Sequence, residues 1–179
     1  MVKYITIITT LLVCFTRPAW ANEEWFFQAG AGVSAVWQKE RDPTREYPTH
    51  TEARPSVQLQ LHRQISERLR LGVGVEALIS DPISWRRSEN LLMFRVAELD
   101  YALSHHWSAS FYGGVARYYR ELPAYGYGFG FGLNYWLAPN WSLSAELNYT
   151  STDTSNNWVD DPYKRDDFAW GSTTLRYRF

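Results

Sequence analysis

The stretch Tyr125-Gly126-Tyr127-Gly128-Phe129-Gly130-Phe131-Gly132-Leu133-Asn134-Tyr135 decides the fold class, because bulky residues alternate in it with small ones. Successive side chains of a β-strand point to opposite faces, so this stretch predicts a strand with one bulky face and one glycine face. Glycine leaves space for neighbouring side chains, as a crowded barrel interior requires. The stretch therefore predicts one strand of a barrel whose inner side is tightly filled.

The same alternation recurs along the chain. Together with the stretch above, it gives eight runs of about ten residues, which fits the strand length and the even strand number of a transmembrane β-barrel. No run of about 18 apolar residues follows the first residues of the chain, which argues against transmembrane helices. The other runs are Trp25–Trp37, Ser56–Ile65, Leu69–Ile79, Leu91–Leu103, Trp107–Tyr119, Trp141–Tyr149 and Phe168–Phe179.

The run Leu91–Leu103 changes its alternation halfway. Its apolar residues occupy even positions up to Val96 and odd positions from Leu99 onward. A single β-bulge near Val96 and Ala97 would return all of them to one face. The bulge would also place three charged side chains on the opposite face, namely Arg95, Glu98 and Asp100.

The connections predict how the barrel is oriented. Short turns are expected at residues 66–68, 104–106 and 138–140, and long loops at residues 38–54, 80–90 and 151–167, with a brief connection at residues 120–124. Short turns on the periplasmic side and longer loops outside are typical of outer-membrane barrels. We therefore expect both termini on the periplasmic side.

Composition limits the function classes. Lys and Arg total 18 against 19 for Asp and Glu, which gives a net charge of -1. Binding driven by counterion release needs a clear positive excess, so no nucleic-acid partner is expected. Aromatic residues make up 17% of the chain, although the mean hydropathy is only -0.38. An average over two opposite strand faces and polar loops hides an apolar band, and the aromatic residues at strand ends predict interfacial girdles. These are Trp25, Trp37, Trp107, Tyr119, Tyr125, Tyr135, Trp141 and Tyr149.

The first residues read as an export signal. Lys3 precedes an apolar stretch, and Ala19-Trp20-Ala21 places small residues where a signal peptidase reads them. We expect cleavage after Ala21, with residues 1–21 removed and residues 22–179 forming one barrel domain. The only cysteine, Cys14, leaves with the signal, so no disulfide is expected.

The polar faces of the runs carry charges of both signs. A soluble lipocalin-like barrel would face water on its outside, whereas here the apolar face is the more continuous one and the charges suit a membrane-barrel interior. An eight-stranded barrel is just wide enough for side chains to fill it, so we expect a charge network in the lumen. Its expected members are Arg70, Glu76, Arg95, Glu98, Asp100, Glu146, Arg176 and Arg178.

Neighbouring strands predict two ion pairs within this network. Glu146 is expected to meet Arg176, and Arg70 is expected to reach Glu98 or Asp100. A path for protons or ions, and hence a small channel, is the alternative reading of the same charges.

The end of the chain carries a family resemblance. Leu175-Arg176-Tyr177-Arg178-Phe179 resembles the closing strand of the small OmpA and OmpX/Ail/Lom barrels, and residues 137–143 are similar to a periplasmic turn of that class. The resemblance implies an all-β, eight-stranded antiparallel up-and-down transmembrane barrel in the bacterial outer membrane. It also implies that Leu175, Tyr177 and Phe179 form the signal read by the barrel-assembly machinery.

Catalysis is the main alternative function. The lipid A deacylase PagL carries a His-x-Ser-Asn signature, but the matching place, Asn148-Tyr149-Thr150-Ser151, has Asn where the base is needed. The palmitoyltransferase PagP begins with an amphipathic helix, whereas residues 22–37 read here as a strand. We therefore expect no catalytic residues, and a lipid A-modifying acyl hydrolase or transferase is kept as an alternative.

No cofactor or metal is expected. The last long loop holds five aspartates but no Asp-x-Asp-x-Asp-Gly pattern, so a solvated acidic loop is the preferred interpretation. Trp85, Arg86 and Arg87 could contact lipopolysaccharide phosphates, since Arg suits phosphate and Trp suits the interface. The expected function is a structural or surface-interaction role through the outer loops, with outer-membrane lipid and lipopolysaccharide as surroundings and an unidentified surface ligand.

Overall fold

The computed structural model describes residues 25–42, 45–46, 49–80, 89–119, 124–153 and 165–179. In these residues, eight long strands and one strand of two residues form a single antiparallel sheet. The strands are β1 (Trp25–Asp42), β2 (Arg45–Glu46), β3 (His50–Gln64), β4 (Leu69–Leu78), β5 (Leu91–Ala102), β6 (Trp107–Tyr118), β7 (Ala124–Ala138), β8 (Trp141–Asp153) and β9 (Arg165–Arg178).

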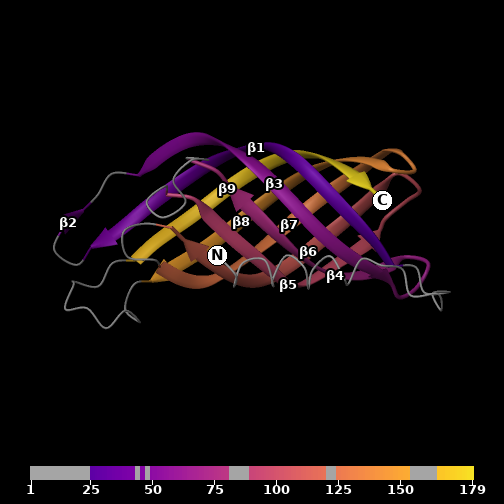
Figure 1. The fold of residues 1–179 in the computed structure, drawn as a ribbon, viewed down its shortest axis with the longest axis horizontal. Helices are drawn as coiled ribbons and strands as arrows, with labels where there is room; N and C mark the ends of the chain where they lie inside the picture. Colours follow the sequence, from indigo (N-terminus) through magenta and orange to yellow (C-terminus); the bar gives the residue numbers. More distant parts are fainter. Residues whose placement is uncertain (1–24, 43–44, 47–48, 81–88, 120–123, 154–164) are drawn as a thin grey trace, which may run out of the picture.

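The sheet closes on itself. Each long strand pairs with the next one along the chain, and β9 pairs back onto β1 from Gln28 opposite Arg178 to Arg41 opposite Arg165. Figure 1 shows the strands wound obliquely around one long axis. The predicted all-β, eight-stranded up-and-down barrel is confirmed. No helix in the described part of the chain is long and apolar enough to cross a membrane.

The alternation sets which face each side chain takes. In β7 the bulky residues Tyr125, Tyr127 and Phe129 are exposed, and the glycines between them face inward. A Cβ atom added at Gly130 would overlap the Tyr112 ring and the Asn148 side chain. The glycine face of β7 is therefore required by the crowded interior, as the sequence predicts.

The bulge in β5 lies at the predicted place. Arg95 pairs with Gly114 of β6 and Ala97 with Gly113, so Val96 is the extra residue. The apolar side chains on both sides of the bulge, among them Phe94 and Leu99, point outward. As a result, three charged side chains of β5 are buried in the barrel, namely Arg95, Glu98 and Asp100.

The short turns and the end of the chain lie together. The β3–β4 turn is closed by the Ile65 N–H donating to the Leu69 carbonyl at 2.9 Å, and the Leu103 N–H donates to the Trp107 carbonyl at 2.8 Å. The Arg178 N–H donates to the Asn140 carbonyl in the third turn at 2.8 Å. These turns and the C-terminus occupy one end of the barrel in Figure 1, and we call it the turn end.

The strands are longer at the opposite end than the sequence predicts. Residues 38–42 and 50–54, expected in a loop, belong to β1 and β3, and residues 151–153 and 165–167 belong to β8 and β9. The backbone pairing of β1 with β9 continues to Arg41. The reason is that a strand projecting beyond an apolar band no longer needs one apolar face, so its sequence loses the alternation while its hydrogen bonds continue.

Aromatic residues gather on the outside at the turn end. The rings of Trp107 and Tyr135 have centroids 4.9 Å apart, as do those of Trp141 and Tyr177. At the opposite end, Trp37 and Tyr125 are exposed. This distribution fits two girdles at the ends of an apolar band, where amphipathic rings are most stable.

Candidate functional site

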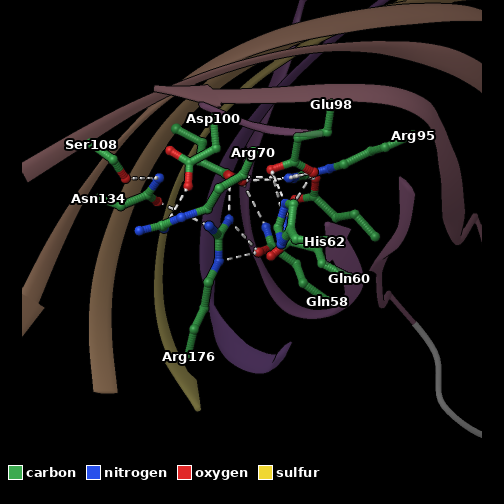
Figure 2. Close-up of polar contacts among 12 residues, drawn as sticks. Gln58, Gln60, His62, Arg70, Arg95, Glu98, Asp100, Ser108, Asn134 and Arg176 are labelled. Atoms are coloured by element: carbon green, nitrogen blue, oxygen red, sulfur yellow. Dashed lines mark hydrogen bonds and ion pairs between the residues drawn. The ribbon is translucent and has the colours of Figure 1, made fainter. Parts of the chain in front are cut away.

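The lumen holds the densest group of charged side chains among the described residues. Six of the eight residues predicted for the charge network are buried there, from β4, β5, β8 and β9, whereas Arg70 and Arg178 lie at the turn end. Figure 2 shows several of them meeting inside the barrel with glutamines from β3.

Arg95 of β5 is the centre of this group and is almost completely buried. Its Nη2 donates to Glu76 at 2.6 Å and to Glu146 Oε2 at 2.7 Å, and its Nη1 donates to Glu146 Oε1 at 3.1 Å. The guanidinium also stacks on the Tyr112 ring, with Cζ 3.7 Å from the ring centroid. Paired hydrogen bonds to one carboxylate fix the orientation of both side chains, so Arg95 joins β4, β6 and β8 across the lumen.

Arg176 of β9 shares the same carboxylate. Its Nη2 contacts Glu146 Oε1, the pair that the sequence predicts. Its Nε donates to Gln58 Oε1 at 2.9 Å and its Nη1 to Asn134 Oδ1 at 2.9 Å. Gln58 donates in turn to Glu146 Oε2 at 2.7 Å, so Glu146 accepts bonds from three side chains.

Glu98 forms the third acidic position of the network. Gln60 Nε2 donates to its carboxylate at 3.2 Å, and His62 Nε2 lies 3.5 Å from Glu98 Oε1. The central carboxylates of Glu76, Glu98 and Glu146 face the guanidiniums of Arg95 and Arg176. Each buried carboxylate of this layer thus lies beside at least one guanidinium.

A separate group lies toward the turn end of the lumen. Arg70 Nη1 contacts Asp100 Oδ2 at 3.0 Å, one of the two partners that the sequence allows for Arg70. The guanidiniums of Arg178 and Arg70 flank the Phe26 ring, with Cζ 4.1 Å and 5.7 Å from its centroid. Arg178 therefore lies at this mouth of the barrel and not in the central network around Glu146, where the sequence predicts it.

Beyond the charged layer the lumen holds an apolar cluster, which the sequence reading does not include. Trp170 borders the two regions, because its ring packs in the apolar cluster while its Nε1 donates to Glu76 Oε1 at 3.1 Å. The predicted filling by charged side chains therefore describes only part of the lumen. The cluster consists of Val36, Leu78, Leu91, Met93, Tyr112, Ala116, Tyr118, Ala124, Phe168 and Trp170.

Several network members were not singled out by sequence reasoning. Gln58, Gln60 and Asn134 are neutral, so a search for charges passes over them. Their signal is positional, since each shares the inward face of its strand with small or polar residues. Arg54 was expected in a loop but is buried near the beginning of β3, where its Nη1 donates to the Glu89 carbonyl at 2.7 Å.

The segment that corresponds to the deacylase signature has a packing role in the structure. Asn148 points into the lumen and accepts a hydrogen bond from the Tyr112 hydroxyl at 2.5 Å. Ser151 lies at the far end of β8, where its hydroxyl accepts a bond from Arg165 Nε at 2.9 Å.

The remaining predicted sites divide into two groups. Leu175, on the outer face of β9, and Phe179, which follows the strand, are both exposed. The Phe179 N–H donates to the Phe27 carbonyl at 2.9 Å. The Tyr177 ring packs on the Phe179 ring, with centroids 4.9 Å apart. Trp85, Arg86 and Arg87 lie outside the described residues, as does the expected cleavage site after Ala21. Within the described ranges, no group of three or more His, Cys, Asp or Glu side chains is placed to hold a metal ion.

Comparisons with known proteins identify the architecture. No protein-family model matches the chain, and no curated protein matches it by sequence. Among solved structures, Neisserial surface protein A (NspA) superposes with a TM-score of 0.54 at 16% identity, covering 88% of this chain and 99% of that one. Ail, the attachment invasion locus protein of Yersinia pestis, in complex with the heparin analogue sucrose octasulfate, superposes with a TM-score of 0.55 at 12% identity, covering 87% of this chain and 99% of that one. At these identities the likeness shows the fold alone, and the chain is a closed eight-stranded barrel like those of NspA and Ail.

Proposed function

We propose that this protein is a non-enzymatic outer-membrane barrel that serves a structural or surface-interaction role through its outer loops, with both termini in the periplasm. The observation that carries the proposal is the filled lumen. A layer of paired charges and a layer of packed apolar side chains occupy it in succession. A barrel filled in this way serves as a rigid support, which leaves the outer connections as the variable part.

The extended strands support the same role. β1 continues five residues beyond the exposed Trp37, to Asp42, and β3 begins at His50. These projecting strands would hold the first outer connection away from the membrane. The comparison proteins include one named a surface protein and one named for attachment and invasion, which agrees with a role at the cell surface.

Single-cysteine labelling in intact cells tests the orientation. The sequence has one cysteine, at position 14, so residues 22–179 offer no competing thiol. We expect His50→Cys to react with a membrane-impermeant maleimide in intact cells, and Glu67→Cys, in the exposed β3–β4 turn, to react only after permeabilisation. Labelling of Glu67→Cys alone in intact cells would reverse the proposed orientation.

Two measurements separate the alternatives. A lipid A-modifying enzyme would change the acyl chains of lipid A when the protein is expressed, and mass spectrometry would detect that change. A small channel would give conductance steps in a planar bilayer, whereas the filled lumen predicts none. Either positive result would replace the proposed function.

A direct test of surface interaction uses the outer connections. Replacing residues 81–88 and 154–164 with short Gly-Ser linkers should abolish binding of expressing cells to any surface they adhere to, while the barrel keeps its heat-modifiable migration on gels. Adhesion that survives both replacements would contradict a role for these loops. Cells expressing the chain with a shortened β3–β4 turn provide the control.

A further inference from the structure

Arg117 is a charged residue on the outer face of the barrel. It lies near the end of β6 farthest from the short turns and shares the face of Phe111 and Val115, both of which are exposed. On β7 it stands opposite Tyr125, whose side chain is also exposed. Arg117 therefore points toward the membrane or its interface, on the side opposite the lumen network.

Two tyrosine rings hold the guanidinium. The Cζ atom of Arg117 lies 4.5 Å from the centroid of the Tyr119 ring and 5.4 Å from that of Tyr125. Arginine stacks on aromatic rings through its flat faces and donates hydrogen bonds from its edge. The stacking therefore orients the group and leaves its edge to bind an acceptor.

The edge of this guanidinium has no acceptor within the described residues. Its Nε is buried from solvent without a hydrogen-bond partner, so an acceptor from outside would meet the group through its Nη atoms. Arg165, at the outer end of β9, provides the contrast, because its Nε donates to Asp167 Oδ1 at 3.1 Å and to Ser151. Arg165 thus has a counterion from the protein, whereas Arg117 is prepared to receive one from outside.

The surroundings indicate the class of that counterion. A cation on the lipid-facing side of a barrel is costly to a degree that depends on depth, and it is tolerated near the interface where anionic headgroups lie. Planar N–H donors match the oxygens of a phosphate, and a tyrosine-lined interface suits the boundary between acyl chains and headgroups.

We propose that Arg117, held by Tyr119 and Tyr125, binds a phosphate of the lipid A headgroup of lipopolysaccharide. The proposal rests on the orientation proposed above, which places this end of the barrel in the outer leaflet. The site is distinct from Trp85, Arg86 and Arg87, because it is built on a strand of the barrel. It would fix the rotational position of the barrel relative to one lipid molecule.

The test compares two lipids and three variants of the refolded full barrel in detergent. Bound lipid is counted by native mass spectrometry with lipid A and with dephosphorylated lipid A. We expect the unmodified barrel to bind lipid A at least about tenfold more tightly than the dephosphorylated form, the size of one charge-assisted interaction. Arg117→Gln should remove that preference, and Arg117→Lys should retain part of it, since an ammonium keeps the charge but loses the fork.

Arg63→Gln is the matched control. Arg63 lies over the exposed Trp25 ring at 5.7 Å, in the same kind of stacking contact but at the turn end of the barrel. It should keep the full preference for phosphorylated lipid. Heat-modifiable migration on gels checks that each variant is folded. If a variant fails to fold, the comparison of the two lipids on the unmodified barrel still tests the proposal.

Three outcomes would overturn the proposal. They are equal binding of both lipids by the unmodified barrel, an undiminished preference in Arg117→Gln, or an equal loss in Arg63→Gln. The proposed orientation fails separately, through the cysteine labelling. A phosphate preference that depends on Arg117 together with reversed labelling would contradict lipid A as the ligand in cells, because the site would then face the leaflet that lacks it.

Discussion

Glu146 shows how one buried carboxylate connects distant strands. It lies on β8, yet it accepts bonds from Arg95 of β5, from Arg176 of β9 and from Gln58 of β3. A buried ion pair need not be more stabilising than an apolar pair of the same shape, but removal of one partner leaves the other charge buried without compensation. The network therefore acts mainly as a geometric requirement that holds four strands in one arrangement.

The first prediction concerns this carboxylate. Glu146→Leu leaves two guanidiniums without their shared acceptor and should lower the free energy of unfolding by about 3–5 kcal/mol. Glu146→Gln keeps the shape and should cost less. Urea unfolding of the barrel refolded in lipid vesicles, followed by tryptophan fluorescence, measures the difference.

The control for this prediction is Glu67→Gln in the exposed β3–β4 turn, which should change stability by no more than about 0.5 kcal/mol. If Glu146→Leu behaved like this control, the ionic layer would be dispensable for folding.

A second residue-scale prediction concerns two glycines that face opposite ways. Gly130→Ala would drive a methyl group into the Tyr112 ring and Asn148, whereas a Cβ at Gly113 meets only the Gly128 carbonyl oxygen, at 3.8 Å. Overpacking of a filled core typically costs about 1–3 kcal/mol, so Gly130→Ala should destabilise the barrel by that amount. Gly113→Ala, on the outer face, should be close to neutral in the same unfolding assay. Equal effects of the two substitutions would contradict the tight inner packing of β7.

At the scale of the element, β5 contains an extra residue that corrects its alternation. Without the bulge at Val96, the sequence would send Glu98 and Asp100 to the lipid or Phe94 to the lumen. A one-residue shift reverses every side chain of a strand, so a single inserted residue is the smallest correction available.

This account predicts that deletions in two paired strands have opposite outcomes. Deletion of Val96 removes the bulge and leaves regular alternation, with Arg95 and Glu98 still facing inward, so the barrel should fold and show heat-modifiable migration. Val115 lies on β6 and pairs with Phe94 of β5. Its deletion inverts the side chains of the rest of β6 and should abolish folding. Refolding of both variants from urea, assayed by gel migration, gives the comparison. If the Val96 deletion variant misfolded while the Val115 deletion variant folded, the result would contradict the pairing register of β5 and β6.

At the scale of the whole molecule, closure depends on the last strand. β9 pairs with both β8 and β1, and the chain ends with Phe179 bonded to the Phe27 carbonyl and packed against Tyr177. Because these few contacts at the exposed end of the chain add little to the pairing of β1 with β9, we expect the terminal residue to contribute little to the stability of the finished barrel. Its resemblance to an assembly signal concerns the route by which the barrel forms.

The whole-molecule prediction separates these two contributions. Deletion of Phe179 should reduce the amount of folded barrel in the outer membrane of expressing cells several-fold, because the resemblance implies that this residue belongs to the assembly signal. The same variant should refold from urea in vesicles with stability within about 1 kcal/mol of the full chain, since only a few contacts at the exposed end of the chain are removed. An equal loss in cells and in vitro would indicate a purely structural role for Phe179.

Much of the fold could be predicted from the sequence. The direction of each side chain alternates with every residue, so the apolar residues of Trp25–Trp37 or Trp141–Tyr149 indicate the outer face directly, and the parity change after Val96 indicates the bulge. The ends of the strands were less well predicted. The projecting residues 38–42 and 165–167 have no apolar face, and their strand conformation comes from hydrogen bonds to a neighbouring strand.

The sequence predicts most of the charged residues of the candidate site, but few of the contacts between them. Inward charges such as Glu146 and Arg176 follow from alternation, and their pairing follows from the adjacency of β8 and β9. The bond from Arg95 to Glu146 could not be predicted in this way, because β5 and β8 are separated by two strands and meet only across the lumen.

The sequence by itself determined the class of fold, the face of each side chain and the charges available to the interior, because these depend on local alternation with a period of two. Only the tertiary structure decided which charges meet, that Arg178 lies at the mouth, and that Trp170 and Phe168 pack in an apolar layer inside the barrel. These features depend on the tilt and stagger with which the sheet closes, which bring residues from non-neighbouring strands to the same height in a narrow lumen.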